Sequence, residues 1–504
     1  MSNATQTVYD LAVVGGGING TGIARDAAGR GLKVVLLEKD DLAAHTSSWS
    51  TKLIHGGLRY LEHFEFRLVA ESLAEREVLL RAAPHIIEAL QFVLPHEPHL
   101  RPAWMIRAGL FLYDHIGGRR TLPSSFAVNL ATSEWGAGLK RKFRQGFVYS
   151  DARVDDSRLV IINAMDARER GADILPRTAL AGARRENGLW HIRTRSAAGD
   201  MNELRARALV NATGPWVKQV QDEVSGMPGR EAVRHIKGSH IVVPRVHPGR
   251  HAYILQNADK RVVFVIPYQD KFSLIGTTDI PVKHYEKPTI SPEEVAYLCD
   301  IASAYLSHPP SPADVVWSYS GVRPLYDDGS VDPSTVTRDY VLKLDSDPEG
   351  TTPLLSIYGG KITTYRRLAE HALTELRKFF PRMGPAWTHR ATLPGGDLPG
   401  GDFAAYRAEI ANLYPFLPPE YREVLLRRHG TRVKQILGDA KSLADLGRHF
   451  GDTLYASEVE YLVAQEWACD AEDILWRRTK CGLHLSEEQR GALAQHMAER
   501  FAHQ

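Results

Sequence analysis

A glycine-rich turn between two apolar runs constrains this chain more than any other feature of its sequence. Residues 11–14 predict a buried strand, which leads into Gly15-Gly16-Gly17-Ile18-Asn19-Gly20, a G-x-G-x-x-G motif. A helical pattern follows over residues 21–30, and a second apolar run at 34–37 ends at Glu38. This order of strand, glycine turn, helix, strand and acid is typical of a βαβ unit that binds a dinucleotide.

Each part of this motif has a physical role in dinucleotide binding. Gly15 permits the tight turn, Gly17 lets the backbone approach a pyrophosphate, and Gly20 lets the helix pack closely on the strand. The helix N-terminus offers free N–H groups to the phosphates. Glu38 suits a ribose hydroxyl pair, and its charge disfavours a 2′-phosphate. The alternative is a βαβ turn without a ligand, but the strands, helix and acid favour the binding site.

Length, charge and cysteine content limit the classes of protein to which the chain can belong. A chain of 504 residues is too long for one ordinary core, so two or three domains are expected. The formal net charge of +2 argues against nucleic acid as a partner. Three cysteines, Cys299, Cys469 and Cys481, lack metal-ligand spacing and suit the reducing cytoplasm. We expect no metal, no signal peptide and no membrane-spanning helix.

A polar stretch at residues 45–63 lies shortly after the glycine motif. It begins with five serines and threonines in close succession, which supply hydroxyl and backbone donors but make a poor helix. Gly56-Gly57 allows a flat ligand to approach the backbone, and His55, Arg59 and Tyr60 surround these glycines. The density of functional side chains beside a phosphate-binding turn favours a ligand site over an ordinary surface loop.

Residues 101–120 combine apolar and aromatic side chains with basic ones. The apolar and aromatic members are Trp104, Ile106, Leu110, Phe111 and Leu112, and the arginines are Arg107, Arg119 and Arg120. Such a segment can lie in a membrane interface with its arginines at anionic headgroups. An inter-domain core helix is the alternative, and the sequence leaves both interpretations open.

A strand-rich region over residues 235–345 predicts a second, mostly antiparallel sheet. Short polar motifs between its apolar runs contain His240, Thr277, Arg323 and Arg338. An arginine at a strand end is usually solvated, but several on one sheet can converge on an anion, because a planar guanidinium matches phosphate oxygens. The sequence therefore indicates a candidate anion site on this sheet.

Two further apolar runs end in glycine turns. The run at 208–212 leads to Gly214, which would be a second backbone approach to a dinucleotide. The run at 354–358 leads into Gly359-Gly360-Lys361, followed by a helix through residue 376. A helix N-terminus together with Lys361 would stabilise negative charge. On these residues alone, an ordinary βα turn with a surface lysine is an equal alternative.

The C-terminal fifth of the chain has the pattern of a separate domain. The pentapeptide LPGGD occurs twice in tandem over residues 393–402 and predicts a linker. Residues 403–504 carry helical patterns and few strand signals, which indicates an α-helical domain. Its one distinctive run, EDILWRRTKCGL at 472–483, gathers Trp476, Arg477, Arg478 and Lys480 without a recognisable set of reactive groups.

Long runs spread over nearly the whole chain resemble one known family. They include GGGINGTGIARDAAGRGL, SSWSTKLIHGGLRYLEHFEFRLV, KGSHIVVPR, SGVRPL, YGGKITTYRRLAEHAL and LWRRTKCGL. On these runs the chain is similar to the flavin-dependent, respiratory sn-glycerol-3-phosphate dehydrogenases of bacteria, members of the D-amino-acid-oxidase-like superfamily. The resemblance implies non-covalent FAD, oxidation of glycerol 3-phosphate to dihydroxyacetone phosphate, and electrons passed to ubiquinone. It also implies a cytoplasmic protein resting on the inner face of the plasma membrane, and it leaves a homodimer open.

The expected fold class is α/β. A Rossmann-like FAD-binding domain is interleaved with a mostly antiparallel sheet domain for the substrate, and a C-terminal α-helical domain follows. The FAD-binding domain is assigned residues 8–80, 145–225 and 350–380. The substrate-binding, membrane-facing domain is assigned residues 81–144 and 226–349. The linker is 393–402, and the helical domain is 403–504.

The resemblance also implies which side chains act. His55 is the first choice of base for the C2 hydroxyl and His240 the second, because imidazole titrates near neutral pH. Arg323 would polarise the substrate oxygen, and Lys361 would lie near the reduced flavin. The expected phosphate contacts are Arg59 and Arg338, with Tyr60 and Thr277 as neutral donors. The expected cofactor contacts are Gly15, Gly17, Ile18, Asn19, Gly20, Glu38, Lys39, Thr46, Ser47, Ser48, Lys52, Leu53, His55, Gly57, Ala179, Gly214, Lys361, Ile362 and Thr363.

Three alternative functions stay open on the sequence. An oxidase of similar fold would pass electrons to oxygen and release peroxide. An amine-oxidising flavoenzyme would need a carboxylate-binding arginine and little other positive charge, whereas the surplus of Arg and Lys near the flavin motifs favours a phosphate dianion. A non-catalytic flavin-binding protein would leave the set His55, Arg59, Arg323 and Lys361 without a purpose.

Overall fold

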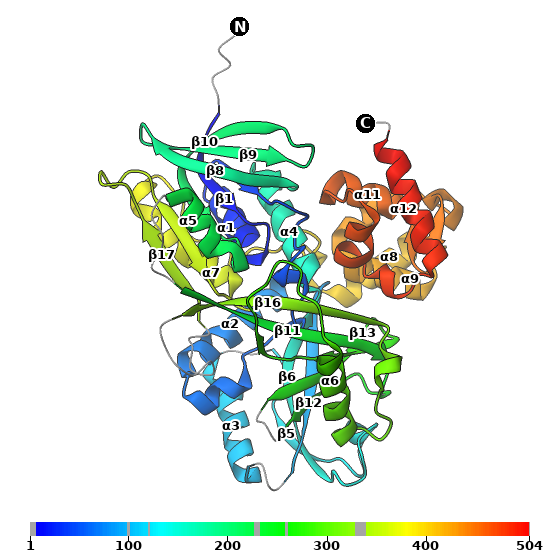
Figure 1. Ribbon diagram of the computed structural model, residues 1–504. Helices are drawn as coiled ribbons and strands as arrows, with labels where there is room; N and C mark the ends of the chain where they lie inside the picture. Colours follow the sequence, from blue (N-terminus) through cyan, green and yellow to red (C-terminus); the bar gives the residue numbers. More distant parts are fainter. Residues whose placement is uncertain are drawn as a thin grey trace.

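Two large sheets and a helical C-terminal domain make up the protein (Figure 1). The computed structural model describes residues 7–97, 101–118, 121–225, 232–257, 261–327 and 339–502. In Figure 1 the first sheet lies at the upper left, the second sheet below it, and the C-terminal helices at the right. The predicted fold class, with two interleaved sheets and a helical tail, is confirmed.

The first sheet has the main order β17-β18-β10-β1-β2-β7, and the strands in this order are parallel except for the edge strand β17. Its strands are β1 (Val8–Val14), β2 (Val34–Leu37), β7 (Asp173–Leu175), β10 (Met201–Asn211), β17 (Val341–Asp345) and β18 (Leu354–Tyr358). A hairpin of β8 (Thr178–Glu186) and β9 (Leu189–Ser196) extends this sheet from β10, to which β9 pairs antiparallel.

Helices cover both faces of the first sheet, which explains why its central strands read as continuous apolar runs. Helices α1 (Ile18–Gly29), α4 (Asp156–Glu169) and α7 (Tyr365–Glu375) pack on one face. Helix α5 (Val217–Ser225) packs against the opposite face, where Val224 joins a core cluster with Val14 and Leu37. Helix α4 is buried nearly all round, because the C-terminal domain covers its outer side.

The second sheet has the order β15-β11-β14-β13-β12-β4-β6-β3, with β16 paired to β11 and β5 to β6. All of these pairs are antiparallel except β12 with β4. The bounds are β3 (Leu53–Ile54), β4 (Ile87–Pro95), β5 (Phe126–Asn129), β6 (Gln145–Val154), β11 (Ala232–Pro244), β12 (Ala252–Gln256), β13 (Val262–Tyr268), β14 (Phe272–Gly276), β15 (Ile280–Pro281) and β16 (Trp317–Asp327). Helix α6 (Pro292–Tyr305) covers one face, and α2 (Phe66–Ala82) and α3 (Ala103–Ile116) cover the other.

Three strands lie outside the domain boundaries assigned from the sequence. Strands β3 and β6 belong to the second sheet, although they fall in the stretches 8–80 and 145–225. Strand β17 belongs to the first sheet, although it ends before residue 350. The physical reason is that β6 pairs with β4 along its length and then runs directly into α4, so one continuous segment crosses between the domains.

The C-terminal domain is helical, as predicted, and contains one small hairpin that its sequence pattern did not indicate. Its elements are α8 (Phe403–Leu413), α9 (Pro419–His429), α10 (Val433–Leu437), β19 (His449–Gly451), β20 (Leu454–Tyr455), α11 (Ala456–Glu466) and α12 (Glu487–Phe501). The linker is packed against both sides: Leu393 N donates to Ala82 O at 2.8 Å, and a Cβ at Gly430 would lie 1.9 Å from Gly395 O. The two parts of the chain are therefore held in contact.

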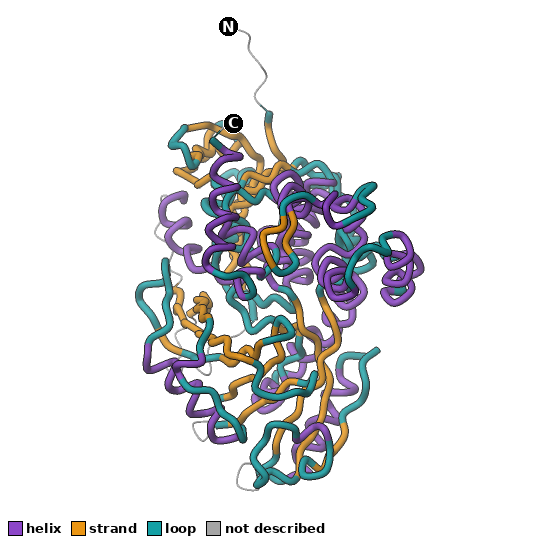
Figure 2. Tube along the Cα trace, turned by 90° about the vertical axis from the view of Figure 1, so that its right-hand side faces the viewer, coloured by secondary structure: helices purple, strands orange, loops and turns teal. Residues whose placement is uncertain are grey.

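A view turned by 90° shows the same division (Figure 2). Helices dominate its upper half, and the long strands of the second sheet run through its lower half. Among the helices of the described residues, none has both the length and the apolar character needed to cross a membrane.

Candidate active site

A cavity of about 650 Å³ opens beside the glycine turn that follows β1. The first domain supplies most of its wall, and Glu286, Lys287 and Pro324 close it from the second. The predicted cofactor residues that line it are Gly15, Gly17, Ile18, Asn19, Glu38, Lys39, Thr46, Ser47, Ala179 and Gly214. Trp216 also lines it, and its place directly after the Gly214-Pro215 turn was the signal that could have identified it.

The glycine turn has the close contacts that its sequence predicts. Gly15 adopts φ +114°, and a Cβ there would lie 2.4 Å from Ala212 O. A Cβ at Gly20 would lie 1.8 Å from Gly15 O, so α1 packs directly on the turn. Gly17 caps α1 without a side-chain hydrogen bond, and a Cβ there would lie 3.0 Å from Ser47 Oγ. Ile18 N donates to Ser47 Oγ at 3.0 Å, and the start of α1 lies in the cavity wall, where a helix N-terminus can bind an anion.

Glu38 lies at the end of β2 with its carboxylate against the same turn. Its Oε2 accepts from Gly16 N at 2.7 Å, and its Oε1 accepts from Asp40 N at 2.8 Å. Burial raises the pKa of Glu38, while the two backbone N–H donors act in the opposite direction. Beside it, Lys39 Nζ lies 4.6 Å from the centre of the Trp216 ring. These groups form a polar end of the cavity suited to a ribose and its base.

Several predicted cofactor residues lie outside the cavity lining found in the described chain and support the residues that form it. Lys52 Nζ donates at 2.8 Å to both Ser48 O and Asp156 Oδ1. Thr363 Oγ1 accepts from His55 N at 3.2 Å. Gly57 adopts φ +75°, and its carbonyl accepts from Tyr60 N at 2.8 Å. Leu53 and Ile362 pack in apolar clusters.

Lys361 is half-buried, and its positive charge acts on the predicted base His55. Its Nζ is buried, has no hydrogen-bond partner among the described residues, and lies 4.0 Å from the centre of the Tyr60 ring. Burial lowers the pKa of His55, and the positive charges of Lys361 and Arg76 lower it further. The negative charge of Asp151 raises this pKa but does not outweigh the other effects. His55 is therefore a neutral imidazole at pH 7, the form that can accept a proton.

Arg323 and Thr277 lie together on the edge of the second sheet. Arg323 Nη2 donates to Asp279 Oδ1 at 2.9 Å. A Cβ at Gly238 would lie 2.7 Å from Thr277 Oγ1 and 3.5 Å from Arg323 Nη2, so both side chains cross over this glycine. Strand β16 connects Arg323 and Thr277 to the residues that line the cofactor cavity, because Thr46 Oγ1 donates to Val322 O at 2.7 Å. The arginine is thus adjacent to the loop that lines the cofactor cavity.

A buried carboxylate, Glu294, supports this edge and was not identified from the sequence. It accepts from Lys237 Nζ at 2.7 Å, Ser239 Oγ at 2.7 Å and Thr278 Oγ1 at 2.8 Å. Its Oε2 also accepts from Ser291 N at 2.8 Å in a capping box at the start of α6. The S-x-x-E spacing of that box was the signal that could have marked it. Glu294 fixes Thr278, which stands between Thr277 and Asp279.

His240, the second choice of base, is locked in the second sheet. Its ring stacks on Tyr319 at 4.8 Å, and its Nε2 lies 3.0 Å from Thr51 Oγ1. Burial, together with the charges of Lys52 and Arg323, lowers its pKa to about 3. A Cβ at Gly276 would lie 2.1 Å from its ring, so the imidazole fills the space over that glycine.

Of the two arginines expected to bind the phosphate, the structure describes Arg59 but not Arg338. Arg59 lies in a 3₁₀ turn, Leu58–His63, beside Tyr60 and is half-buried without a salt bridge to any described residue. Arg338 lies outside the described residues.

Helix α3 contains most of the segment in which membrane contact was predicted. Trp104 is 69% and Phe111 is 66% exposed, and Leu112 is also exposed. Leu110 is only 1% exposed and Ile106 packs on the same core, so these two side chains face the protein, contrary to the prediction. The helical period explains the difference, because an amphipathic helix must turn one face inward. Arg119 and Arg120 lie outside the described residues.

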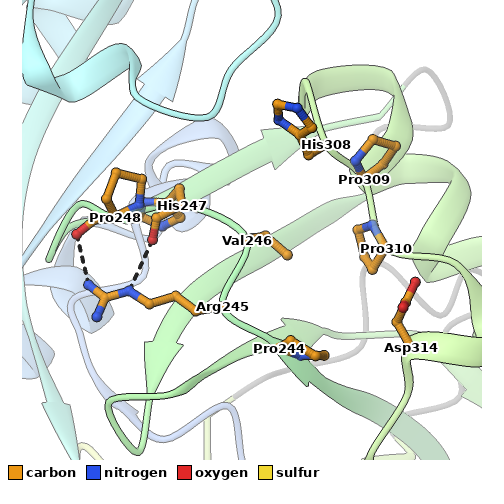
Figure 3. Close-up of a pocket in the computed structure, with 9 residues that line it drawn as sticks. All are labelled: Pro244, Arg245, Val246, His247, Pro248, His308, Pro309, Pro310 and Asp314. Carbon is orange, nitrogen blue, oxygen red and sulfur yellow. Dashed lines mark hydrogen bonds between the residues drawn. The ribbon is translucent and has the colours of Figure 1, made fainter.

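A second cavity, of about 540 Å³, lies where β11 ends (Figure 3). Arg245 in its wall donates from Nε to His247 O at 3.0 Å and from Nη2 to Pro248 O at 2.9 Å, as the dashed lines in Figure 3 show. Its lining includes none of the predicted site residues in the described chain. The cavity beside the glycine turn is therefore the candidate site.

Two family models cover almost the whole chain. Residues 10–366 match the family described as FAD dependent oxidoreductase, and residues 386–503 match the C-terminal domain of alpha-glycerophosphate oxidase. The chain therefore belongs to the family of FAD-dependent oxidoreductases. The predicted cofactor, FAD, is confirmed.

Similar proteins narrow this class. The chain is 55% identical over 501 residues to Glycerol-3-phosphate dehydrogenase of Pseudomonas aeruginosa, covering 98% of this chain and 96% of that protein. It is 51% identical to D-erythritol 1-phosphate dehydrogenase of Brucella abortus, covering 96% and 97%. The X-ray structure of the glycerol-3-phosphate dehydrogenase from Bacillus halodurans complexed with FAD has a TM-score of 0.76 and 26% identity, covering 98% and 91%. The resemblance found in the sequence is confirmed.

The residues around the cavity fit FAD. The start of α1, where Ile18 N donates to Ser47 Oγ at 3.0 Å, would hold the pyrophosphate, and Glu38 the ribose. Asn19 Oδ1 and Lys361 Nζ are buried and have no hydrogen-bond partner in the described chain, so both are left for a ligand.

Proposed function

We propose that this chain oxidises glycerol 3-phosphate to dihydroxyacetone phosphate. The observation that carries the proposal is the Nζ of Lys361, which is buried and has no hydrogen-bond partner among the described residues, together with a neutral His55. Both belong to the same structure as a cofactor cavity of about 650 Å³. The names of the similar proteins support a polyol phosphate as substrate. When bound, the flavin supplies the acceptor for the hydride that leaves C2.

His55 takes the proton of the C2 hydroxyl. Its lowered pKa keeps the imidazole neutral at pH 7, and its backbone is fixed by the hydrogen bond from its N–H to Thr363 Oγ1. Because removal of the proton concentrates negative charge on the substrate oxygen, a nearby cation stabilises the change. Arg323 is assigned this role, since only one of its nitrogens is engaged by Asp279.

Arg59 and Arg338 hold the phosphate, with Tyr60 and Thr277 as neutral donors. Arg59 is half-buried and makes no salt bridge with a described residue, so its charge is available to an anion. Lys361 offsets the negative charge that accumulates on the cofactor side. His240, stacked and hydrogen-bonded in the sheet, supports this wall of the site.

The substrate assignment is tested by comparing two polyol phosphates. Purified, FAD-loaded protein is mixed with glycerol 3-phosphate and, separately, with D-erythritol 1-phosphate, and flavin absorbance is followed. We expect the larger kcat/KM with glycerol 3-phosphate. A larger value with the four-carbon substrate would reassign the substrate within the same chemistry, and no reaction with either would refute the proposed dehydrogenase.

We propose a membrane quinone, ubiquinone, as the electron acceptor, reached from the cytoplasmic face of the plasma membrane. A quinone is confined to the bilayer, so the reduced flavin must come near the lipid surface. The exposed face of α3, with Trp104, Phe111 and Leu112, supports interfacial docking. Phe64, which is 78% exposed, directly follows the adjoining 3₁₀ turn, and Phe66 begins α2; both extend this apolar surface.

The energies are sufficient for reversible attachment. Each large apolar side chain contributes about 1.5–3 kcal/mol when it leaves water. Arg107 adds roughly 1 kcal/mol at an anionic surface. Vesicle flotation tests this: a Trp104→Asp/Phe111→Asp double variant should stay with the soluble fraction. A control variant, Met201→Asp at the exposed first residue of β10, should float like wild type. Equal flotation of the double variant and wild type would refute docking by α3.

Oxygen is the second candidate acceptor, because the C-terminal family model is named after an oxidase. Peroxide released during turnover in air separates the two. We expect little peroxide and fast reduction of a short-chain quinone, whereas stoichiometric peroxide would assign the oxidase.

A further inference from the structure

The run at 472–483, which the proposed function does not use, belongs to the C-terminal domain and contacts the first domain. Residues Asp473–Arg478 form a π-helical turn, and Lys480 follows with a left-handed backbone. Arg478 and Lys480 are almost fully buried. A buried arginine and lysine are costly unless they are paired, so their partners identify what this turn contacts.

Arg478 binds the carboxylate of Asp41 with both terminal nitrogens. Its Nη1 donates to Oδ2 at 2.5 Å and its Nη2 to Oδ1 at 2.8 Å, and Arg477 Nε donates to the same Oδ2. On its other side, Arg478 donates to Glu466 O at the end of α11. Asp41 is three residues beyond Glu38, and Ala43 N donates to Gly16 O at 3.1 Å. The arginine thus ties the C-terminal domain to the backbone beside the glycine turn.

Lys480 contacts the first domain at a second place, the start of α4. Its Nζ donates to Ser157 Oγ and lies 3.4 Å from Asp155 Oδ1, at the start of α4. The next residue of that helix, Asp156, binds Lys52, which in turn donates to Ser48 O. Lys480 therefore fixes the helix end on which residues 48–52 are anchored.

Trp476 provides a third, apolar contact. Its ring stacks on Trp317 with centres 4.6 Å apart and planes 16° apart. Trp317 lies 6.0 Å from Trp49, whose Nε1 donates to Ala44 O at 3.2 Å. Trp476 is therefore linked, through Trp317 of the second sheet and Trp49, to the backbone at Ala44.

We define residues 39–52 as the cofactor loop. Within it, the only regular structure among the described residues is the short 3₁₀ turn Thr46–Ser48, so a backbone hydrogen-bond ladder does not hold its shape. The loop nevertheless supplies Lys39, Thr46 and Ser47 to the cavity wall. A loop of this kind needs external anchors to avoid other conformations, and the three contacts above supply them at its start, middle and end.

We propose that Trp476, Arg478 and Lys480 form a clamp by which the C-terminal domain holds the cofactor loop in its FAD-binding conformation. The cavity lining in the described chain does not include these three side chains, so they are positioning residues. Without the clamp, only a fraction of the molecules has the loop in place, and the apparent FAD affinity falls by that fraction. The C-terminal domain thereby acquires a role in cofactor retention that is independent of the substrate and the electron acceptor.

The test measures FAD affinity rather than turnover. Apoprotein of Trp476→Leu, Arg478→Lys and wild type is titrated with FAD, and flavin fluorescence gives Kd at a temperature well below each melting point. Arg407→Gln is the matched control, since Arg407 pairs bidentately with Glu423 within the C-terminal domain. A general loss of stability would leave the Kd of the native protein unchanged, so Kd separates positioning from mere folding.

We expect Kd to rise about tenfold or more in Trp476→Leu and Arg478→Lys, the result of leaving the loop in place in about a tenth of the molecules. The Trp476→Phe variant, which keeps an aromatic ring on Trp317, should recover most of the affinity, and Arg407→Gln should match wild type. Because Arg478→Lys alters a buried ion pair and could abolish folding, Trp476→Leu decides the question. Unchanged Kd in Trp476→Leu, or an equal rise in Arg407→Gln, would overturn the proposal.

Discussion

Replacing Glu294 by Gln removes one negative charge from the buried hydrogen-bond network at the edge of the second sheet that also carries Arg323. The substitution keeps the side-chain volume. The carboxylate accepts from Lys237, Ser239, Thr278 and the Ser291 backbone, at 2.7–2.8 Å. An amide can accept at only one end, so Lys237 or a hydroxyl loses its partner. Breaking one partner of a buried ion pair costs about 3–5 kcal/mol. Because Lys237 keeps some access to water, we expect about 3 kcal/mol, at the low end of that range.

This loss should be visible in thermal unfolding and in the pH dependence of stability. At roughly 2–4 °C per kcal/mol, the midpoint of the second domain should fall by about 6–12 °C. Burial opposes ionisation of Glu294, but Lys237 and the three hydrogen bonds prevail and lower its pKa below the ordinary 4.5. Its contribution is therefore complete above pH 4.5 and is lost as the pH falls through the lowered pKa. The Gln variant should lose less stability than wild type over that acid range.

The assay uses Glu293→Gln as the control, because this neighbouring carboxylate is exposed at the start of the same helix. Calorimetry from pH 3 to pH 8 gives the midpoints, and steady-state kinetics at pH 7 gives kcat. We expect kcat of Glu294→Gln to fall, by less than the roughly 10²–10³-fold expected for removing a transition-state donor outright. Equal midpoints for the two variants would refute the structural role assigned to Glu294.

Three other predictions concern the cofactor, the base and helix α3. Gly17→Val should lose flavin on purification, measured as the ratio of flavin to protein absorbance, because the side chain would occupy the phosphate position; full FAD content would contradict this. The lowered pKa of His55 predicts that kcat/KM of the wild type stays level near pH 7 and falls only below pH 6.5. The His55→Gln variant should lose kcat but retain FAD. An unchanged kcat in this variant would mean that another residue is the base. Leu110→Asp should destabilise the fold by several kcal/mol, since a charge would be buried, whereas Phe111→Asp should leave the melting temperature unchanged and reduce vesicle binding; the opposite pattern would contradict the orientation of α3.

The sequence predicted those elements that are determined by residues close to one another along the chain. The turn from Gly15 to Gly20 has the close approaches that its spacing demands, and Glu38 stands where the second strand ends. Apolar runs buried by helices on both sides became the central strands of the first sheet. The turn, its helix and Glu38 all lie within residues 11–38, so one stretch of sequence contains the information for this βαβ unit. The approach of Gly15 to Ala212 and the pairing of β1 with β10 join segments that are far apart in the sequence.

What the sequence did not show depends on contacts between distant segments. Glu294 is far in sequence from its partner Lys237, and Asp41 is still farther from Arg478. Leu110 was expected at a membrane because composition does not fix which face of a helix turns inward. Strand β6 was placed with the helix that follows it, although its pairing partner β4 determines the sheet to which it belongs. Such pairings are fixed only when the whole chain has folded.

The most direct test of the proposed chemistry is anaerobic addition of glycerol 3-phosphate to the purified, FAD-loaded protein. The flavin spectrum and the product are measured together, with glycerol as the control that lacks the phosphate. We predict loss of the oxidised flavin absorbance and one dihydroxyacetone phosphate per flavin, with no change on adding glycerol. A flavin spectrum that stays oxidised after glycerol 3-phosphate would contradict the account.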